Sequence, residues 1–379
     1  MPRPLPAPAL TAFCLLLAAL GAAYTGLGIR RLTADVTGSF PVDLRLRWME
    51  SRLLVEGRNT QRVGHPDALI PASHEIMRRS GGAYPPWSYL FGLLFVPPAA
   101  WWQARYYFAA LNLLALGAVG WFAWARAGRL TRTEALVAAV LPFTSFPAAI
   151  CLSYGQYGVV VTALVAGAIV LLERGHGGRA GLVLGLSLVK PQLAAPFCIA
   201  LAATRRWRAC LAAGLLLAGA TLAMAAMVGE TPGGVAATAV TEMRHARASS
   251  NPLLDGLSVV MHQRHAVVVL GLAATALMAA LAASRPAEPF PLACLSVVVA
   301  MFWTHRKHFD ASLMTLPLVW LWLEAMRTKR PADLAVFLAV GLTLWAPLRD
   351  AGWDLWWVQA VHLAVWAGCG AWIYRRSTA

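Results

Sequence analysis

Apolar runs long enough to cross a lipid bilayer follow one another along almost the whole of this 379-residue chain. A helix of about 20 apolar residues spans the hydrocarbon core, and about twelve runs approach that length. They lie near 9–29, 86–101, 105–125, 133–151, 157–173, 179–203, 208–228, 265–283, 290–304, 310–326, 332–349 and 355–374. The pattern predicts an all-α, polytopic membrane protein with about 12 transmembrane helices, the first of them uncleaved rather than a signal peptide.

The composition agrees with a protein embedded in lipid. Hydrophobic residues make up 59% of the chain and charged residues only 13%, whereas about a quarter of a soluble domain is charged. The 16 Trp residues suit the membrane–water boundary. The net charge of +15 does not indicate nucleic acid, because the basic residues cluster between apolar runs, as topology signals and contacts to anionic headgroups do. The six Cys are widely spaced without a CxxC, which is typical of buried thiols and not of a disulfide frame or a zinc site.

Two polar segments interrupt the apolar pattern, at about 30–86 and about 229–264. Neither end of the chain carries a second, soluble domain, so residues 1–379 are predicted to form a single transmembrane domain. The positive-inside rule places the basic clusters at 205–208 and 327–330 in the cytoplasm, and both polar segments then become external loops.

Two basic clusters, Arg126–Arg132 and Arg174–Arg179, fall on the wrong side in a strict count of twelve crossings. One or two runs are therefore predicted to be re-entrant or half-length. The run around Lys190 is a candidate, because a Lys and two prolines, Pro191 and Pro196, interrupt it.

The first candidate for chemistry is Asp43, at the start of the segment 42–58. Its apolar residues and intervening charges suit an amphipathic helix at the membrane surface, which Gly57 would end. Asp43 is then either a functional carboxylate or a first-turn acid favoured by the helix dipole. The residues alone leave both interpretations open.

Three further polar breaks lie between apolar runs. Tyr84 precedes two prolines that suit the first turn of a helix. Gln156 lies in a Gly-flanked stretch that is either a tight interhelical turn or an amide positioned to bind a sugar hydroxyl or a phosphate. Lys190 is about ten residues from either end of its run, which is far to snorkel at helical rise, so an anionic partner such as a lipid phosphate is favoured.

The densest polar cluster between two apolar runs comes late in the chain, over residues 303–310. His305 and His308 have helical spacing, but no carboxylate completes a metal site convincingly, so neither a metal nor a cofactor is predicted. Arg306 and Lys307 suit a phosphate on which charge develops as it leaves. The chemistry indicated is that of a carboxylate and cations at a membrane face.

The order of these motifs resembles that of a known family. A first helix, an external loop opening with Asp on an amphipathic helix, Tyr-Pro-Pro, Gly-Gln before a helix, Lys-Pro, and a His/Asp-bearing loop before a Leu/Pro-rich helix follow one another over roughly residues 9–325. This resembles the polytopic GT-C glycosyltransferases, and specifically glycosyltransferase family 87, the polyprenyl-phosphate-mannose-dependent mannosyltransferase-like proteins. The resemblance implies a GT-C membrane fold and inverting transfer of a hexose, with mannose expected, from a polyprenyl-phosphate donor.

The resemblance also implies roles for individual residues. Asp43 inherits the role of general base, with Asp35 as the fallback. The late loop departs from the pattern of many relatives, so either His308 or Asp310 is the matching position. The substrate-binding residues expected on this basis are Tyr84, Gln156, Lys190, His305, Arg306, Lys307, His308 and Asp310.

The function expected from the sequence is therefore that of a multi-pass enzyme of the inner (plasma) membrane, working on the cell envelope with its active site on the external face. Its partners would be a polyprenyl-phosphate sugar donor, a lipid or glycan acceptor and membrane lipids. A transporter or flippase for an anionic lipid-linked substrate is the alternative, although no internal repeat of the kind common in transporters is visible. A non-catalytic scaffold or degenerate relative is the third possibility.

Overall fold

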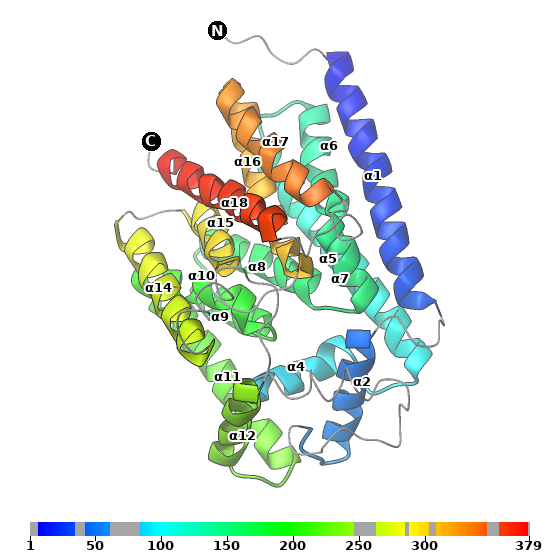
Figure 1. Cartoon of the computed structure of the whole chain (residues 1–379), viewed down its shortest axis with the longest axis vertical. Helices are drawn as coiled ribbons and strands as arrows, with labels where there is room; N and C mark the ends of the chain where they lie inside the picture. The colour runs from blue at the N-terminus through cyan, green and yellow to red at the C-terminus, as the bar shows by residue number, and fades with distance from the viewer. Residues whose placement is uncertain are drawn as a thin grey trace.

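The computed structural model describes residues 7–34, 42–60, 84–245, 263–284, 288–302, 308–346 and 356–377. Every element in these ranges is an α-helix or a short 3-10 helix, which confirms the all-α prediction. Figure 1 shows a long bundle with a smaller group of helices, α2 (Val42–Val55), α4 (Pro86–Phe95) and α12 (Pro232–His245), at its lower end. We call this group the cap.

Three helices of the described residues are long and apolar enough to cross a membrane by themselves. They are α1 (Ala7–Thr33), α5 (Trp101–Ala127) and α11 (Trp207–Met227). A fourth span is possible from α6 (Arg132–Val140), η2 (Leu141–Thr144) and α7 (Phe146–Tyr154), which are bent by 41° at their break. Helices of this length and apolarity belong in a bilayer, so the chain is a membrane protein.

The remaining predicted runs are also helical, most of them as short helices. They form α8 (Gly158–Glu173), α9 (Gly177–Ser187), α10 (Pro191–Ala203), α14 (Gln263–Ser284), α15 (Pro289–Ala300), η3 (His308–Met314), α16 (Thr315–Thr328), α17 (Pro331–Trp345) and α18 (Trp356–Arg376). The described residues therefore do not confirm twelve full crossings. Prolines at the first positions of α10, α15 and α17 divide apolar sequence into separate helices, because Pro lacks the N–H that a continuing helix requires.

The run around Lys190 forms a helical hairpin. A Cβ on Gly177 would lie 3.4 Å from Cβ of Arg208, and one on Gly185 would lie 2.9 Å from Cδ2 of Leu216. A later residue of α9 therefore contacts a later residue of α11, which means that the two helices run parallel. α10, which lies between them in the sequence, must run in the opposite direction. The hairpin brings the start of α9 to the same end of the bundle as the start of α11, with Lys190 at its turn.

This hairpin resolves the conflict over the basic clusters. Arg126 at the end of α5 forms an ion pair with Glu173 at the end of α8. Arg327 at the end of α16 donates to the Arg126 carbonyl oxygen at 3.0 Å. Since Gly177 lies against Arg208, the clusters at 126–132, 174–179, 205–208 and 327–330 all gather at one end, which we call the basic end.

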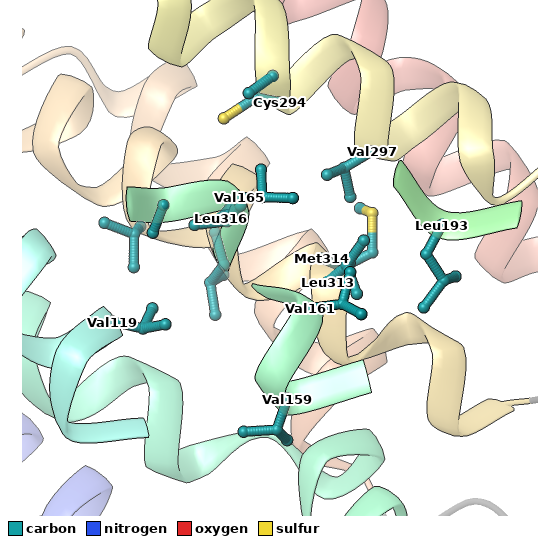
Figure 2. Close-up of a cluster of buried hydrophobic side chains, with 14 of the residues drawn as sticks. Val119, Val159, Val161, Val165, Leu193, Cys294, Val297, Leu313, Met314 and Leu316 are labelled. Carbon is teal, nitrogen blue, oxygen red and sulfur yellow. The ribbon is translucent and has the colours of Figure 1, made fainter. Parts of the chain in front are cut away.

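The bundle core is made of branched aliphatic side chains from helices far apart in the sequence. Figure 2 shows Val161 and Val165 of α8 facing Leu193 of α10 and Val297 of α15, with Leu313 of η3 beside them. Each is at most 3% exposed. Buried apolar surface of this kind is the main term that orders such a core, and it positions α8, α10 and η3 relative to one another.

Two helices of the cap, α2 and α12, lie in the segments that the sequence predicted as long loops. The third, α4, belongs to the run at 86–101 that was predicted to cross the membrane, but it has only 10 residues, which is too short for a full crossing. Leu54, Tyr89 and Met224 form an apolar cluster. It packs α2 and α4 against the C-terminal end of α11. The prediction of a helix at 42–58 is confirmed, since α2 ends at Val55 and Gly57 has a φ of 75°. A layer of helices therefore covers the end of the bundle opposite the basic end.

Candidate functional site

The predicted Gly-Gln turn separates two helices at the boundary between the bundle and the cap. α7 ends at Tyr154, and Gly155 caps it in the left-handed conformation at φ 74°, which Gly adopts without steric cost. The Gln156 backbone N–H then donates to the Cys151 carbonyl at 2.9 Å. This closes the turn before α8 begins at Gly158. Because the backbone N–H makes this bond, the Gln156 side chain is available to other side chains.

The two glycines of this turn allow close approach from opposite sides. A Cβ on Gly155 would overlap the Cβ of Leu44, the residue after Asp43 on α2. A Cβ on Gly158 would lie 2.5 Å from Oγ of Ser312 in η3. The absence of both side chains thus brings the cap helix and η3 to the same turn.

Four residues predicted from the sequence meet at this turn. The Gln156 Nε2 donates to Asp43 Oδ2 at 2.6 Å, and Lys190 Nζ donates to Gln156 Oε1 at 3.0 Å. Lys190 also forms an ion pair with Asp310. Because an ammonium can only donate and a carboxylate only accept, the orientation of the amide is dictated by its two neighbours. We call these four residues the Gln156 network.

Lys190 is held at the turn of the α9–α10 hairpin. Pro191 starts α10, and Trp87 Nε1 of α4 donates to the Leu188 carbonyl at 3.0 Å. The Lys190 ammonium also lies 4.7 Å from the centre of the Phe309 ring, a geometry in which the ring face attracts a cation. The motif Tyr-Pro-Pro-Trp therefore supports the Lys-Pro motif directly.

Exposure divides the network into a buried and an accessible half. Lys190 and Asp310 are each 2% exposed, and burial of a charge is tolerated only with its partner beside it. Asp43 and Gln156 are partly exposed. A ligand can therefore reach the Asp43 carboxylate, which accepts a hydrogen bond from the neutral amide of Gln156. The ion pair anchors the other end of that amide.

A second polar group lies next to this accessible half. The Arg47 guanidinium lies 4.4 Å from the centre of the Tyr84 ring and 2.7 Å from Glu50 Oε2. Burial raises the pKa of Glu50 to about 7, against the opposing effect of Arg47 and with a further increase from Asp43. Glu50 is therefore poised to exchange its proton near neutral pH, and the Arg47–Glu50 pair is not permanently neutral.

Sequence reasoning missed this pair because it interpreted the charges of 42–58 as facing the membrane surface. The structure buries them instead, with Arg47 and Glu50 about one-tenth exposed. A signal was present, since Asp43, Arg47 and Glu50 are spaced by four and three residues and so share one helix face. The opposite face of the helix carries the exposed Arg45 and Arg52.

The other predicted positions lie mainly outside the described residues. These are Asp35, His305, Arg306 and Lys307, and at His308 only the backbone, as the start of η3, is described. Of the two alternatives in the late loop, Asp310 is the one seen in contact with Lys190. Within the described part of the chain, no group of three His, Cys, Asp or Glu residues could hold a metal ion.

The arrangement offers specific chemistry. An accessible carboxylate next to a neutral amide can take a proton from a hydroxyl. Nearby cations on Lys190 and Arg47 can stabilise negative charge on a departing phosphate. Tyr84 lies beside one of these cations, since the Arg47 guanidinium covers its ring.

Comparison with known proteins adds one result. No curated protein matches the chain. The model of glycosyltransferase family 87 matches residues 83–304, which is more than half of the chain and includes Tyr84, Gln156 and Lys190, whereas Asp43 and Asp310 lie outside the match. On the extent of this match, the chain belongs to glycosyltransferase family 87.

Proposed function

We propose that this membrane glycosyltransferase transfers a hexose, mannose in the first instance, from a polyprenyl-phosphate donor to a lipid or glycan acceptor, with Asp43 as the general base. The observation that carries the proposal is the Gln156 network, in which an accessible carboxylate is tied to a buried cation through one amide. A glycosyltransferase needs a proton acceptor and a site for the leaving group, and the network supplies both on adjoining residues.

The reaction follows from this geometry. The acceptor hydroxyl gives its proton to the Asp43 carboxylate as its oxygen attacks the anomeric carbon. The bond from that carbon to the phosphate oxygen breaks on the opposite face, and the polyprenyl phosphate leaves with the electron pair. The sugar configuration is inverted. Phosphate is a tolerable leaving group when cations hold it, so the mechanism needs no metal.

Two cations lie close to the expected phosphate site. Lys190 is buried and compensated by Asp310, so it acts on the site mainly by orienting the Gln156 amide, to which it donates. Arg47 is compensated by Glu50, whose pKa near 7 allows the pair to carry a positive charge when Glu50 is protonated. Arg306 and Lys307 of the late loop are further candidates from the sequence.

The placement of the basic end supports an external active site. The Gln156 network lies where α8 begins, and the basic end lies where α8 ends. Basic clusters favour the cytoplasmic side. We therefore propose that the network faces the outside of the plasma membrane, where lipid-linked sugars serve the cell envelope.

The proposal is tested with purified protein in proteoliposomes and radiolabelled polyprenyl-phosphate-mannose. Wild-type protein is expected to produce a labelled acceptor, and Asp43→Ala is expected to produce none at equal protein yield. Glu56→Ala, on an exposed carboxylate of the same segment, is the control and is expected to match wild type. Movement of intact donor across the bilayer without transfer would instead identify a flippase, and full transfer by Asp43→Ala would reject the assignment of the base.

A further inference from the structure

A cavity of about 670 Å³ opens at the basic end, between α5, α8, α15 and α16. Small residues hollow it out, including Ala118 and Ala125 of α5 and Ala163 and Gly167 of α8. Its volume is within the range of sites for small molecules and headgroups. Its lining on α8 runs from Ala163 to Arg174, which at 1.5 Å per residue is about 10 to 27 Å from Gln156. None of the four residues of the Gln156 network lines it, so it is separate from the proposed site of transfer.

The cavity carries an excess of positive charge. Arg126, Arg174 and Arg327 line it, together with Glu173 and Glu288. The ion pair of Arg126 with Glu173 is internal. Neither Arg174 nor Arg327 forms an ion pair with a carboxylate of the described residues, and the contact of Arg327 with a backbone oxygen leaves its charge in place.

The other walls are apolar and aromatic. Phe122, Phe290 and Trp320 line the cavity, and the Arg126 guanidinium lies over the rings of Phe122 and Phe290 at 3.7 and 5.1 Å. Trp121 stands at its edge and is 70% exposed. Trp side chains are enriched at the depth of lipid headgroups.

An apolar stripe leads from the cavity into the bilayer. Leu114, Ala118, Trp121 and Ala125 are spaced by four, three and four residues, so they share one face of α5. Leu114 is 72% exposed on a helix long and apolar enough to cross the membrane. A ligand in the cavity can therefore extend an acyl chain along this face, which a free phosphate ion would leave unused.

We propose that this cavity binds the headgroup of an anionic phospholipid, with the lipid phosphate between Arg174 and Arg327 and an acyl chain against Leu114 and Trp121. Basic pockets between membrane helices are suited to anionic headgroups. The uncompensated arginines provide the attraction and the stripe on α5 selects a lipid over a soluble anion. The bound lipid would connect the ends of α5, α8 and α16, in addition to the ion pair of Arg126 with Glu173 and the hydrogen bond from Arg327.

The test uses full-length detergent-purified protein. Binding of phosphatidylglycerol, phosphatidylcholine and inorganic phosphate is measured by native mass spectrometry and by the shift of the thermal transition. Wild type is expected to bind phosphatidylglycerol and to be stabilised by it, with little response to the other two. Arg174→Gln/Arg327→Gln is expected to weaken phosphatidylglycerol binding about tenfold or more, since each basic residue near the headgroup contributes about 1 kcal/mol.

The matched control is Arg129→Gln/Arg179→Gln, which removes the same charge from exposed positions at the same end outside the cavity lining. It is expected to keep its affinity within about twofold of wild type, a difference of under half a kcal/mol. Ala118→Trp, which fills the cavity from an exposed position, is expected to lose binding without removing charge. Equal losses in the control and the cavity variant, or equal responses to phosphatidylcholine or inorganic phosphate, would overturn the proposal. These readouts do not depend on sugar transfer.

Discussion

The side-chain amide of Gln156 donates a hydrogen bond to the carboxylate of Asp43 at 2.6 Å, although one residue comes from the cap and the other from the bundle. The same amide accepts from Lys190. The amide therefore links the partly exposed carboxylate of Asp43 to a buried ion pair.

Replacing Gln156 with Leu should keep the fold and remove the link between Asp43 and Lys190. The loss of a charge-assisted hydrogen bond at a reacting carboxylate is expected to lower the rate of transfer by about tenfold to a hundredfold. Helix content by circular dichroism should stay unchanged. A Gln156→Leu protein with the rate of wild type would show that the amide is not required to position the base.

Gly155→Ala tests the close approach of the cap to the turn. A Cβ at this position would overlap Leu44, so α2 must move and Asp43 with it. Transfer activity is expected to fall to background. Gly175→Ala is the matched control, because Gly175 has a similar φ of 77° but no atom within 4 Å of its Cβ position. It should cost only the conformational penalty of about 1–2 kcal/mol and keep activity.

Variants of the buried Lys190–Asp310 ion pair can distinguish its effect on protein stability from its effect on sugar transfer. Lys190→Met alone should destabilise the protein by about 3–5 kcal/mol, because it leaves a buried carboxylate uncompensated. Lys190→Met/Asp310→Leu should recover most of that stability, since an apolar pair is tolerated in the same place. Thermal unfolding and transfer assays on both proteins check this, and the double variant is expected to remain inactive. Recovery of activity with stability would assign Lys190 a purely structural role.

The raised pKa of Glu50 is expected to make the stability of the folded protein depend on pH. Its pKa is raised from 4.5 to about 7 in the folded protein, so the folded state holds this proton more tightly than the unfolded state. The contribution of Glu50 to stability is then fully present below about pH 4.5 and is lost as pH rises towards 7. Glu50→Gln should flatten the fall in melting temperature over this window, whereas Glu56→Gln, on an exposed side chain, should leave it unchanged. An identical pH profile in wild type and Glu50→Gln would contradict the assignment.

The sequence predicted those parts of the molecule that depend on local patterns. Apolar runs identified the helices, Gly57 and Gly155 marked helix ends, and the prolines after Lys190 marked the hairpin. It did not determine the number of crossings, because a run of apolar residues has the same composition whether it spans the bilayer or folds back within it. The direction of α10 becomes clear only from the glycine contacts between α9 and α11.

For the candidate site, the sequence indicated several of the residues but not the contacts between them. Asp43, Gln156 and Lys190 stood out because each is polar within or beside apolar sequence. The contact of Asp310 with Lys190 depends on the direction in which η3 presents that side chain, which helical spacing does not specify. Arg47 and Glu50 were missed because their spacing from Asp43 shows only that the three share one helix face. Whether that face is buried depends on how α2 packs against α4 and α11, which the local sequence does not specify.

The central claim is that Asp43 acts on the acceptor and not on the donor, and single-turnover measurements on Asp43→Asn test it most directly. The amide keeps the size of the carboxylate but cannot take a proton at this step. The account predicts donor affinity within about twofold of wild type and a rate of sugar transfer lowered by at least about a hundredfold. A variant that binds the donor poorly, or one that transfers sugar at the rate of wild type, would contradict the account.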